Sequence, residues 1–260
     1  MQVRTPLLAM ALVLAGTTLA GAAGTHDTIR AKPVPTTVVN PSAQQLRTSV
    51  QQAATLASVH VVWSTSYGNH SYRNTAEVSQ LGGLVTIVST VGKNKGSASA
   101  VVTPTMAYLK ADVFSLRSTF NFSAAGAAKY AGKWLSFTAK QPLYRTISST
   151  ASFSSIISSM SLRAPFTTLK ADKIGATPVI GIRGVAAGSS DSSIGEGQTI
   201  TIYLSTETGL PVRVLPLSKA ASAWCLDFSS WGEPVVIAVP NGAISSSAIR
   251  ESFRLNDNVL

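Results

Sequence analysis

The sequence predicts an α+β fold in which a long series of β-strands is interrupted by about three α-helices. Within residues 199–214, apolar and polar side chains alternate with the two-residue period of half-buried strands, and Glu207–Gly209 supplies a tight turn between them. Other segments carry apolar residues three and four positions apart, which is typical of amphipathic helices. Charged residues make up only 12% of the chain, about half the usual share, which favours a β-rich exported protein.

The N-terminal region has the features of an export leader. Arg4 precedes the apolar run Leu7–Leu14, and Ala20–Ala22 offers a small-x-small cleavage site, so residues 1–22 are predicted to be a signal peptide. A retained membrane anchor is the alternative, although the run is shorter than the roughly 20 strongly apolar residues that span a bilayer. Residues 23–41 are polar and rich in proline, which predicts a linker.

One folded domain is predicted over residues 42–240, followed by a C-terminal tail, 241–260. Ser42 is a suitable N-cap for a first helix, in which Leu46, Val50 and Ala53 recur at helical spacing. Alternating side chains and intervening turns predict the strands that follow. These strands cover residues 59–67, 85–91, 97–103, 105–110, 133–138, 166–173, 177–185, 199–204, 210–214 and 224–229.

Two further helices are predicted between the strands. The first spans Val113–Tyr130 and the second Thr150–Leu162, each with an apolar stripe along one face. These stripes have two interpretations. They either fill the hydrophobic core or form the mobile wall of a ligand cavity.

Three segments of the sequence resemble a known family. They are Ala127–Trp134, Gly209–Arg213 and Phe228–Val235. Together they resemble the actinobacterial LolA-like envelope proteins, the LprG/LppX-type lipoproteins, over roughly the chain from the first helix to Pro240. The resemblance implies a single curved antiparallel β-sheet, a half-barrel wrapped around the helices, with an apolar cavity that carries lipid.

The cysteine content separates this chain from the lipoproteins that it resembles. Those proteins carry a lipidated cysteine just after the leader, whereas Cys225 is the only cysteine here. Lipid anchoring by that route is therefore excluded, as are an intramolecular disulfide and a cysteine-based metal cluster. We expect a secreted protein of the extracytoplasmic cell envelope, with Cys225 on one face of a strand.

The sequence shows no catalytic, metal-binding or cofactor motif. It lacks serine-hydrolase signatures, metal-ligand spacings and glycine-rich nucleotide loops. His60 is predicted on the polar face of a strand, and His70 in a solvated turn. We therefore expect no enzyme activity and no cofactor, and a glycosidase-type pair of Asp172 and Asp227 is the one catalytic alternative left open.

The formal net charge of +10 favours anionic partners, or simply keeps an exported protein soluble. Nucleic acid is not an expected partner, because the basic residues are scattered and form no binding motif. The sequence identifies no protein partner, whereas a membrane surface is compatible with the charge.

The expected function is non-catalytic binding and transfer of a lipid, glycolipid or other amphiphile in the bacterial cell envelope. The alternative is a secreted structural or interaction domain with a filled core. The expected lining of the apolar cavity comes from the two later helices, and two lysines beside one helix end would form a headgroup rim. The lining residues are Phe120, Tyr130, Phe153, Ile156, Ile157 and Met160, and the rim residues are Lys129 and Lys133.

Overall fold

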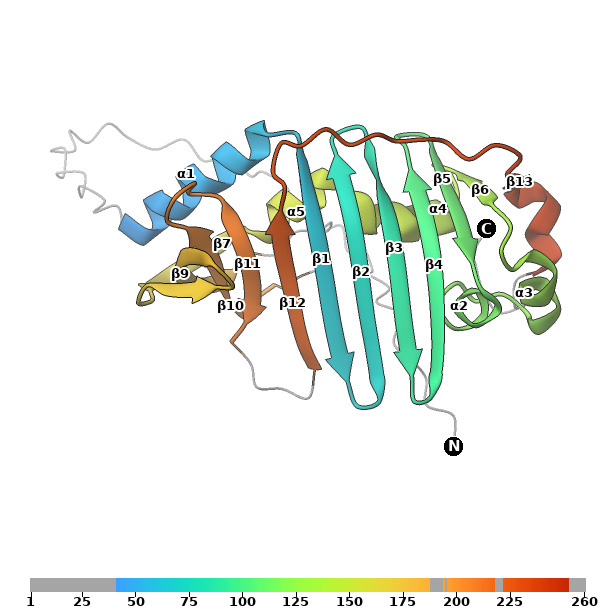
Figure 1. Cartoon of the computed structure of the whole chain (residues 1–260), viewed down its shortest axis with the longest axis horizontal. Helices are drawn as coiled ribbons and strands as arrows, with labels where there is room; N and C mark the ends of the chain where they lie inside the picture. Colours follow the sequence, from blue (N-terminus) through green and yellow to red (C-terminus); the bar gives the residue numbers. More distant parts are fainter. Residues whose placement is uncertain (1–40, 188–193, 195, 218–221, 253–260) are drawn as a thin grey trace, which may run out of the picture. The chain divides into compact units, whose positions relative to one another are not determined.

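The structure is a computed structural model that describes residues 41–252 except 188–193, 195 and 218–221. The predicted signal peptide and nearly all of the predicted linker lie outside these residues. The described part of the chain contains one large antiparallel sheet and several short helices (Figure 1). The α+β fold with a single curved antiparallel sheet is therefore confirmed.

The sheet has 13 strands, and most neighbours in the sheet are also neighbours in the sequence. The order runs β13-β6-β5-β4-β3-β2-β1-β12-β11-β10-β9-β7, with β8 paired to β9. Every pairing is antiparallel except that of β13 with β6. The strands are β1 (Ser58–Tyr67), β2 (His70–Ser79), β3 (Gly82–Val91), β4 (Asn94–Val102), β5 (Met106–Ala111), β6 (Leu135–Thr138), β7 (Leu162–Thr168), β8 (Asp172–Ile174), β9 (Thr177–Ala186), β10 (Thr199–Ser205), β11 (Pro211–Pro216), β12 (Ser222–Ser229) and β13 (Ile244–Ser245).

Strands β1 to β4 form a meander of long hairpins joined by tight turns. Gly68 and Gly92 adopt positive φ, 54° and 60°, in the two turns at one end of these hairpins. Such turns match the right-handed twist of the flanking strands, and glycine accepts their backbone conformation without steric cost. Gly209 likewise has φ 72° in the predicted turn before β11, which is confirmed.

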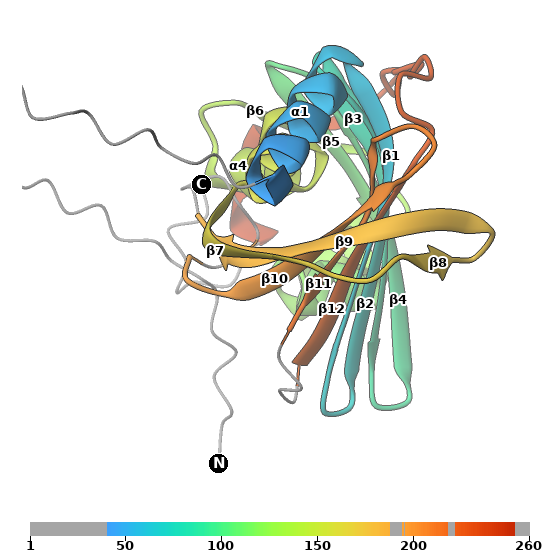
Figure 2. The same cartoon turned by 90° about the vertical axis from the view of Figure 1, so that its left-hand side faces the viewer.

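The helices lie on one face of the sheet, and the sheet curves towards them (Figure 2). In this view α1 and α4 lie beside β1–β5, while β9 and β10 curve round beneath the helices. The face that carries the helices is called the concave face below, and the opposite one the outer face. The helices are α1 (Pro41–Thr55), α2 (Val113–Ser118), α3 (Ala124–Tyr130), α4 (Pro142–Ser148) and α5 (Phe153–Ser159), with 3-10 helices η1 (Ser149–Ala151) and η2 (Ser246–Ser252).

The prediction of one continuous helix over Val113–Tyr130 is wrong, because the chain breaks between α2 and α3. Asn121 adopts a left-handed φ of 58°, and Phe120 and Phe122 on either side of it are both buried. Ser123 then caps α3, since its hydroxyl accepts a hydrogen bond from the backbone N–H of Gly126 at 3.0 Å. The break lets both phenylalanine rings enter the core.

The helix predicted over Thr150–Leu162 is also interrupted. Helical structure begins earlier, with Pro142 in the first turn of α4, then passes through η1 and ends with α5. Ser152 caps α5 through the backbone N–H of Ser155, and the Ser159 hydroxyl donates to a carbonyl of its own helix. Such serine hydrogen bonds compete with helix continuation, which explains the short segments.

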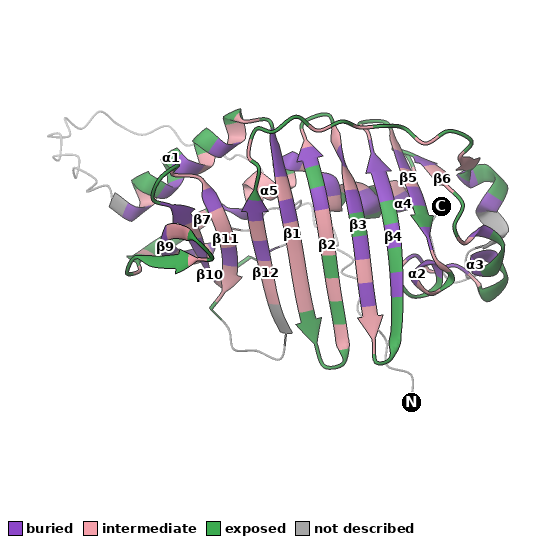
Figure 3. Ribbon diagram, in the orientation of Figure 1, coloured by how far each residue is buried: buried purple, intermediate pink, exposed green. Residues whose placement is uncertain are grey.

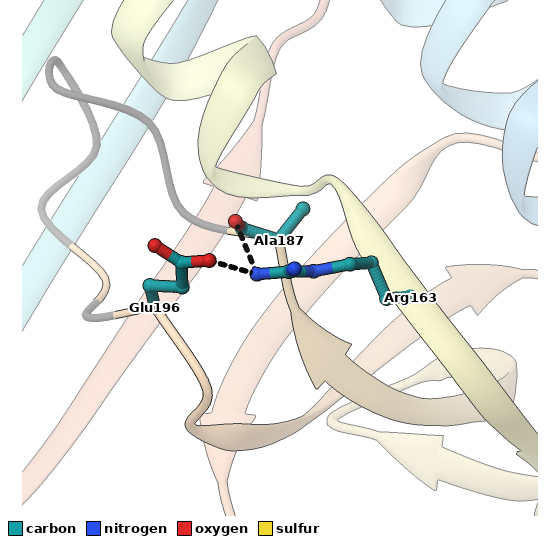
Figure 4. A network of polar contacts seen from close by, with 3 residues as sticks. All are labelled: Arg163, Ala187 and Glu196. Carbon is teal, nitrogen blue, oxygen red and sulfur yellow. Dashed lines mark hydrogen bonds and ion pairs between the residues drawn. The ribbon is translucent and has the colours of Figure 1, made fainter. Parts of the chain in front are cut away.

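Arg163 makes two polar contacts at the curved end of the sheet (Figure 4). Arg163, at the start of β7, donates to the carbonyl oxygen of Ala187 at 2.9 Å and forms an ion pair with Glu196. Ala187 follows β9 and Glu196 precedes β10, so one guanidinium connects three parts of the sheet. Both charged side chains are largely exposed, at 53% and 68%, so this pair contributes little to stability.

The segment predicted as a C-terminal tail contributes to the same sheet. β13 pairs with β6, and Ile249 in η2 is fully buried. Before it, Trp231 donates its indole N–H to the Pro211 carbonyl at 2.9 Å, and Gly232 turns the chain with φ 80°. The chain then runs along the ends of β1 to β5 (Figure 1).

Candidate functional site

The concave face of the central strands is free of formal charge. Burial alternates along these strands, so the face to which each residue belongs follows from its position (Figure 3). On β1 to β5 and the described side chains of β12, every Lys, Arg, Asp and Glu falls on the outer face. These residues are Arg73, Glu77, Lys95, Lys110 and Asp227.

One part of the concave face is packed under helices. We call it the helix-covered region; η1 packs against β2 and β3, and α4 against β4, β5 and β6. Its members are apolar and at most 2% exposed: Val78, Val85, Ala100, Leu109 and Phe137. This region is a filled hydrophobic core.

A second part of the concave face is aromatic and polar. It lies towards the hairpin turns of β1 to β3, and we call it the aromatic–polar patch: Trp63, Tyr67, His70, Tyr72, Asn74 and Ser89. Trp63 pairs with Asn74, Tyr67 with His70, and Tyr72 with Ser89 across neighbouring strands. Directly paired side chains have Cβ atoms about 5 Å apart and diagonal neighbours about 7–8 Å, so the patch is continuous.

Three rings of the patch stack on one another. The Tyr67 ring lies 4.8 Å from His70, at an angle of 8°, and 6.2 Å from Tyr72, at an angle of 20°. The prediction that His70 lies in a solvated turn is wrong, because His70 begins β2 and is half-buried against Tyr67. The turn residues are instead Gly68 and Asn69.

The patch concentrates buried polar atoms that have no hydrogen-bond partner. Six such atoms occur in the described part of the chain, and four of them belong to the patch. They are the Trp63 Nε1, His70 Nδ1, Asn74 Oδ1 and Ser89 Oγ atoms. Each buried polar group without a partner costs about 1–3 kcal/mol, so a cluster of four demands an explanation.

Tyr72 is held in its neutral form. The pKa of Tyr72 is raised to about 12. Burial is the largest cause, followed by a hydrogen bond with Tyr67 and by charge repulsion from Tyr67. Tyr72 therefore carries no charge over the physiological pH range.

Several large apolar side chains that pack against the core are only partly buried. Trp63 and Trp224 on the sheet, and Ile156 and Ile157 on α5, pack against the core but keep part of their surface accessible. Part of the surface of each of these residues is therefore open to solvent.

The structure places the six predicted lining residues in one continuous hydrophobic cluster. Phe120, Tyr130, Phe153 and Met160 are members of the core, while Ile156 and Ile157 pack against it. Lys129 and Lys133 lie over the Tyr130 ring, with their Nζ atoms 5.1 and 5.9 Å from its centroid. The helix end that carries these lysines, α3, is well separated from α5 (Figure 1). The lysines and the two isoleucines therefore do not share one site.

Sequence analysis did not single out the patch. β2 is absent from the predicted strands because its concave face carries His70, Tyr72 and Asn74. Apolar residues at these positions would have indicated a strand. One signal for this strand was present in the sequence. Ring and amide side chains alternate with Ser71, Arg73 and Thr75, which gives a two-residue period without aliphatic residues.

The outer face has a shallow hollow of about 440 Å³. Most of the residues that line this hollow point to the outer face according to their strand positions. They include Ser64, Arg73, Val88, Leu215 and Cys225. Cys225 lies on a strand face, as predicted. Burial first, and then Asp227, raise the pKa of Cys225 to about 11, while Arg213 opposes the shift, so the thiol is protonated and unreactive at neutral pH.

Among the described residues, no group of three or more His, Cys, Asp or Glu side chains gathers as a metal site. Within the same residues, every helix is too short or too polar to cross a membrane.

Comparison with known proteins gives a likeness of architecture. No protein-family model matches the chain, and no curated protein matches it. Among solved structures, LprF from Mycobacterium bovis aligns with a TM-score of 0.49 and 18% identity, over 77% of this chain and 97% of LprF. The lipoprotein LppX from Mycobacterium tuberculosis aligns with a TM-score of 0.47 and 15% identity, over 75% of this chain and 97% of LppX.

A LolA superfamily protein from Nitrosomonas europaea is also similar, with a TM-score of 0.27 and 10% identity over 74% of this chain and 96% of that protein. All three alignments have identities of 18% or less. The resemblance of the sequence to LprG/LppX-type proteins stays a prediction. What this fold does in the protein follows from its own residues.

Proposed function

We propose that this domain binds and transfers a lipid or another amphiphile in the bacterial cell envelope, without catalysis. The observation that carries the proposal is the concave face, which is curved, uncharged and incompletely sealed. Trp63, Trp224 and Ile157 keep accessible apolar surface there, beside a core that is otherwise closely packed. An acyl chain that covers such surface gains about 0.8 kcal/mol for each buried CH₂ group.

The alternative is a structural or interaction domain with a filled core, and one observation favours it. Four of the six predicted lining residues, Phe120, Tyr130, Phe153 and Met160, are at most 7% exposed. In the carrier proposal these four belong to the fixed core of the domain, and Ile156 and Ile157 on α5 form the part that contacts ligand.

A substitution on α5 separates the two functions. Ile157→Trp enlarges a half-buried side chain on the proposed wall, so a carrier should keep its fold and lose lipid binding. In a filled core, the same change should overpack and destabilise the protein by about 1–3 kcal/mol. Ser154→Trp, at an exposed position of the same helix, is the matched control and should change neither property.

Lipid binding is best measured first on the protein as purified from a bacterial envelope fraction. Native mass spectrometry should show a co-purified amphiphile that is lost from Ile157→Trp and retained by Ser154→Trp. Protein without any amphiphile, together with no saturable uptake of long-chain lipid in solution, would favour the structural domain.

The lysines beside Tyr130 carry a separate part of the proposal. Lys129 and Lys133 are exposed and offer two positive charges at the end of α3, so this end would face anionic lipid headgroups at a membrane surface. Replacing both by glutamine should weaken binding to vesicles that contain phosphatidylglycerol. Binding to vesicles of phosphatidylcholine alone should not change.

Export completes the proposal. The leader predicted over residues 1–22 would be cleaved, so the mature chain would begin near Ala23 and carry no lipid on cysteine. N-terminal sequencing of secreted material checks this, and a chain that still begins at Met1 would contradict it.

A further inference from the structure

The hollow on the outer face of the sheet has the size and the chemistry of a ligand site. Its volume of about 440 Å³ falls within the range of about 300–1,000 Å³ that small-molecule sites occupy. Most of its lining points away from the helices. The hollow is therefore separate from the concave face to which the function proposed above is assigned.

The hollow begins where the pairing of β11 with β12 ends. Among the described residues, these two strands pair only at Arg213–Val214 and their partners on β12. Leu215 and Cys225 come next on the two strands, and instead of pairing they line the hollow. On the other side of β12, β1 stays in register with β2 along its whole length, so the floor of the hollow is a regular sheet surface.

Hydroxyl groups are arranged on this floor as a grid. Ser66, Ser71 and Thr90 are direct neighbours on β1, β2 and β3. Ser64 lies two residues before Ser66 on the same face of β1. Side chains paired across neighbouring strands have Cβ atoms about 5 Å apart. Hydroxyl groups at this spacing can each reach a different hydroxyl of one sugar ring, since a hydroxyl both donates and accepts.

These hydroxyls are free of partners within the described part of the chain. No hydrogen bond to another described residue is made by the side chains of Ser64, Ser66, Ser71 and Thr90. Other serines of the protein are engaged, since Ser123 and Ser152 each cap a helix. The four hydroxyls of the hollow are half-buried or exposed, so a ligand can replace the water that satisfies them.

The hollow also carries positive charge that the protein leaves unpaired. Arg73 lines it, Lys95 lies beside Thr90 at its rim, and neither forms an ion pair with a described residue. None of the described residues that line the hollow is Asp or Glu. The carboxylate of Asp227, further along β12, is already paired with Arg213. A free guanidinium offers two parallel N–H groups to a carboxylate or phosphate, so the hollow favours an anionic ligand.

Two aliphatic side chains complete the lining. Val88 on β3 and Leu215 on β11 are half-buried and border the polar floor. They can cover the C–H face of a sugar ring while the hydroxyls bind its edge. An inorganic anion would leave both the aliphatic groups and most of the hydroxyls unused, and a hydrocarbon would leave the polar groups unused.

We propose that the hollow is a binding site for a saccharide that carries one anionic group, either a carboxylate or a phosphate. Arg73 binds the anionic group, and the hydroxyls of Ser64, Ser66 and Ser71 exchange hydrogen bonds with those of the sugar. The site goes beyond the lipid carrier and does not depend on it, because it uses the opposite face of the sheet.

The test titrates the full chain with small probes at neutral pH and follows backbone amide resonances by NMR. Glucuronic acid and glucose 6-phosphate combine sugar and anion, glucose is the sugar alone, and acetate and inorganic phosphate are anions alone. We expect at least one anionic sugar to bind about tenfold more tightly than glucose or either simple anion and to shift the Ser64 and Ser71 resonances. The tighter of the two anionic sugars identifies the anionic group. Glucose or a simple anion binding as tightly would overturn the proposal.

Arg73→Gln tests the charge. Because Arg73 is exposed and unpaired among the described residues, the variant should fold normally, lose about tenfold in affinity for the anionic sugar and bind glucose as before. Lys110→Gln is the matched control, since it removes one positive charge from an exposed position of the same face on β5, outside the hollow. Equal losses in both variants would show that net charge alone attracts the probes, and the site would be wrong.

The double variant Ser66→Ala/Ser71→Ala tests the hydroxyls. It should weaken the binding of the anionic sugar and of glucose alike, whereas Thr86→Ala/Ser99→Ala, another exposed pair of neighbouring hydroxyls on the outer face, should change neither. Unaltered binding by the first double variant would overturn the assignment of a saccharide. Failure of these tests leaves the lipid carrier untouched, and failure of lipid binding leaves the saccharide site untouched, because the two sites lie on opposite faces.

Discussion

The helix-covered region and the aromatic–polar patch share strands β2 and β3, yet their side chains differ in kind. Under η1 and α4 the concave side chains are aliphatic or phenyl groups that need only close packing, and they are at most 2% exposed. Towards the hairpin turns, β1 to β3 carry rings and polar groups, and four of these hold a buried atom that has no partner among the described residues. The first region is organised for stability, whereas the unpaired polar groups of the second lower it.

The largest expected effect tests the helix-covered region. Phe137→Ala removes a ring that is 0% exposed beneath α4, so it should lower the free energy of unfolding by about 3–5 kcal/mol. Thr86→Ala, at an exposed position on the outer face of β3, is the control and should change it by less than about 0.5 kcal/mol. Urea unfolding measures both, and equal small effects would show that the region under the helices is not a packed core.

The next effect tests whether the packed part extends to the segment after β12. Trp231 contacts Phe228, with ring centroids 5.8 Å apart, and its indole N–H donates to Pro211 at 2.9 Å. Because Trp231 is half-buried, Trp231→Ala should cost about 2–3 kcal/mol, and Trp231→Phe only the hydrogen bond, about 1 kcal/mol. A melting temperature unchanged by the alanine variant would assign Trp231 to a surface role.

A smaller effect compares two buried serines directly. Ser58 is 5% exposed and donates a hydrogen bond, so Ser58→Ala should destabilise the protein by about 1 kcal/mol. Ser89 is 0% exposed and has no partner among the described residues, so Ser89→Ala should be neutral or slightly stabilising. If both alanine variants lose equal stability, the distinction between the two regions fails.

The last expected effect is the response of Tyr72 in the patch, and of Cys225 on the outer face, to alkaline pH. The pKa values of Tyr72 and Cys225 are raised from 10.0 to about 12 and from 9.0 to about 11, so the folded protein keeps protons that the unfolded chain releases. The free energy of unfolding should therefore be unaffected below pH about 9 and decrease as pH rises towards about 12. Urea midpoints measure this, and Tyr72→Phe should flatten the decrease above pH about 10. A midpoint that increases over this range would contradict the assignment.

Much of the sheet was predictable because its signals are local. The alternation of Ile200, Ile202 and Leu204, and the turn at Gly209, appear directly in the sequence, and β10 and β11 form where they predict. The helix break at Asn121 was not predictable in the same way. Its cause is the burial of both Phe120 and Phe122, which depends on strands far away in the sequence.

The predicted ligand-binding residues also show which properties are local and which depend on tertiary packing. Their membership in the apolar interior was readable from helical spacing, and all six enter or contact the hydrophobic cluster. Spacing contains no information on which of them stay accessible. That property separates Ile156 and Ile157 from Phe153 and Met160, and it depends on how the chain packs around α5 in three dimensions.

The sequence by itself determined the class of fold, most strands and their turns, because a strand buried on one face must repeat every two residues. It also determined that Cys225 forms no disulfide within the chain, since no second cysteine exists. Only the tertiary structure decided that Trp63, Asn74 and Ser89 meet on one uncharged face with unpartnered polar atoms. The physical reason is that hydrogen-bond satisfaction is settled by cross-strand register and by the cover of remote helices, and neither quantity is encoded in the local pattern of any one strand.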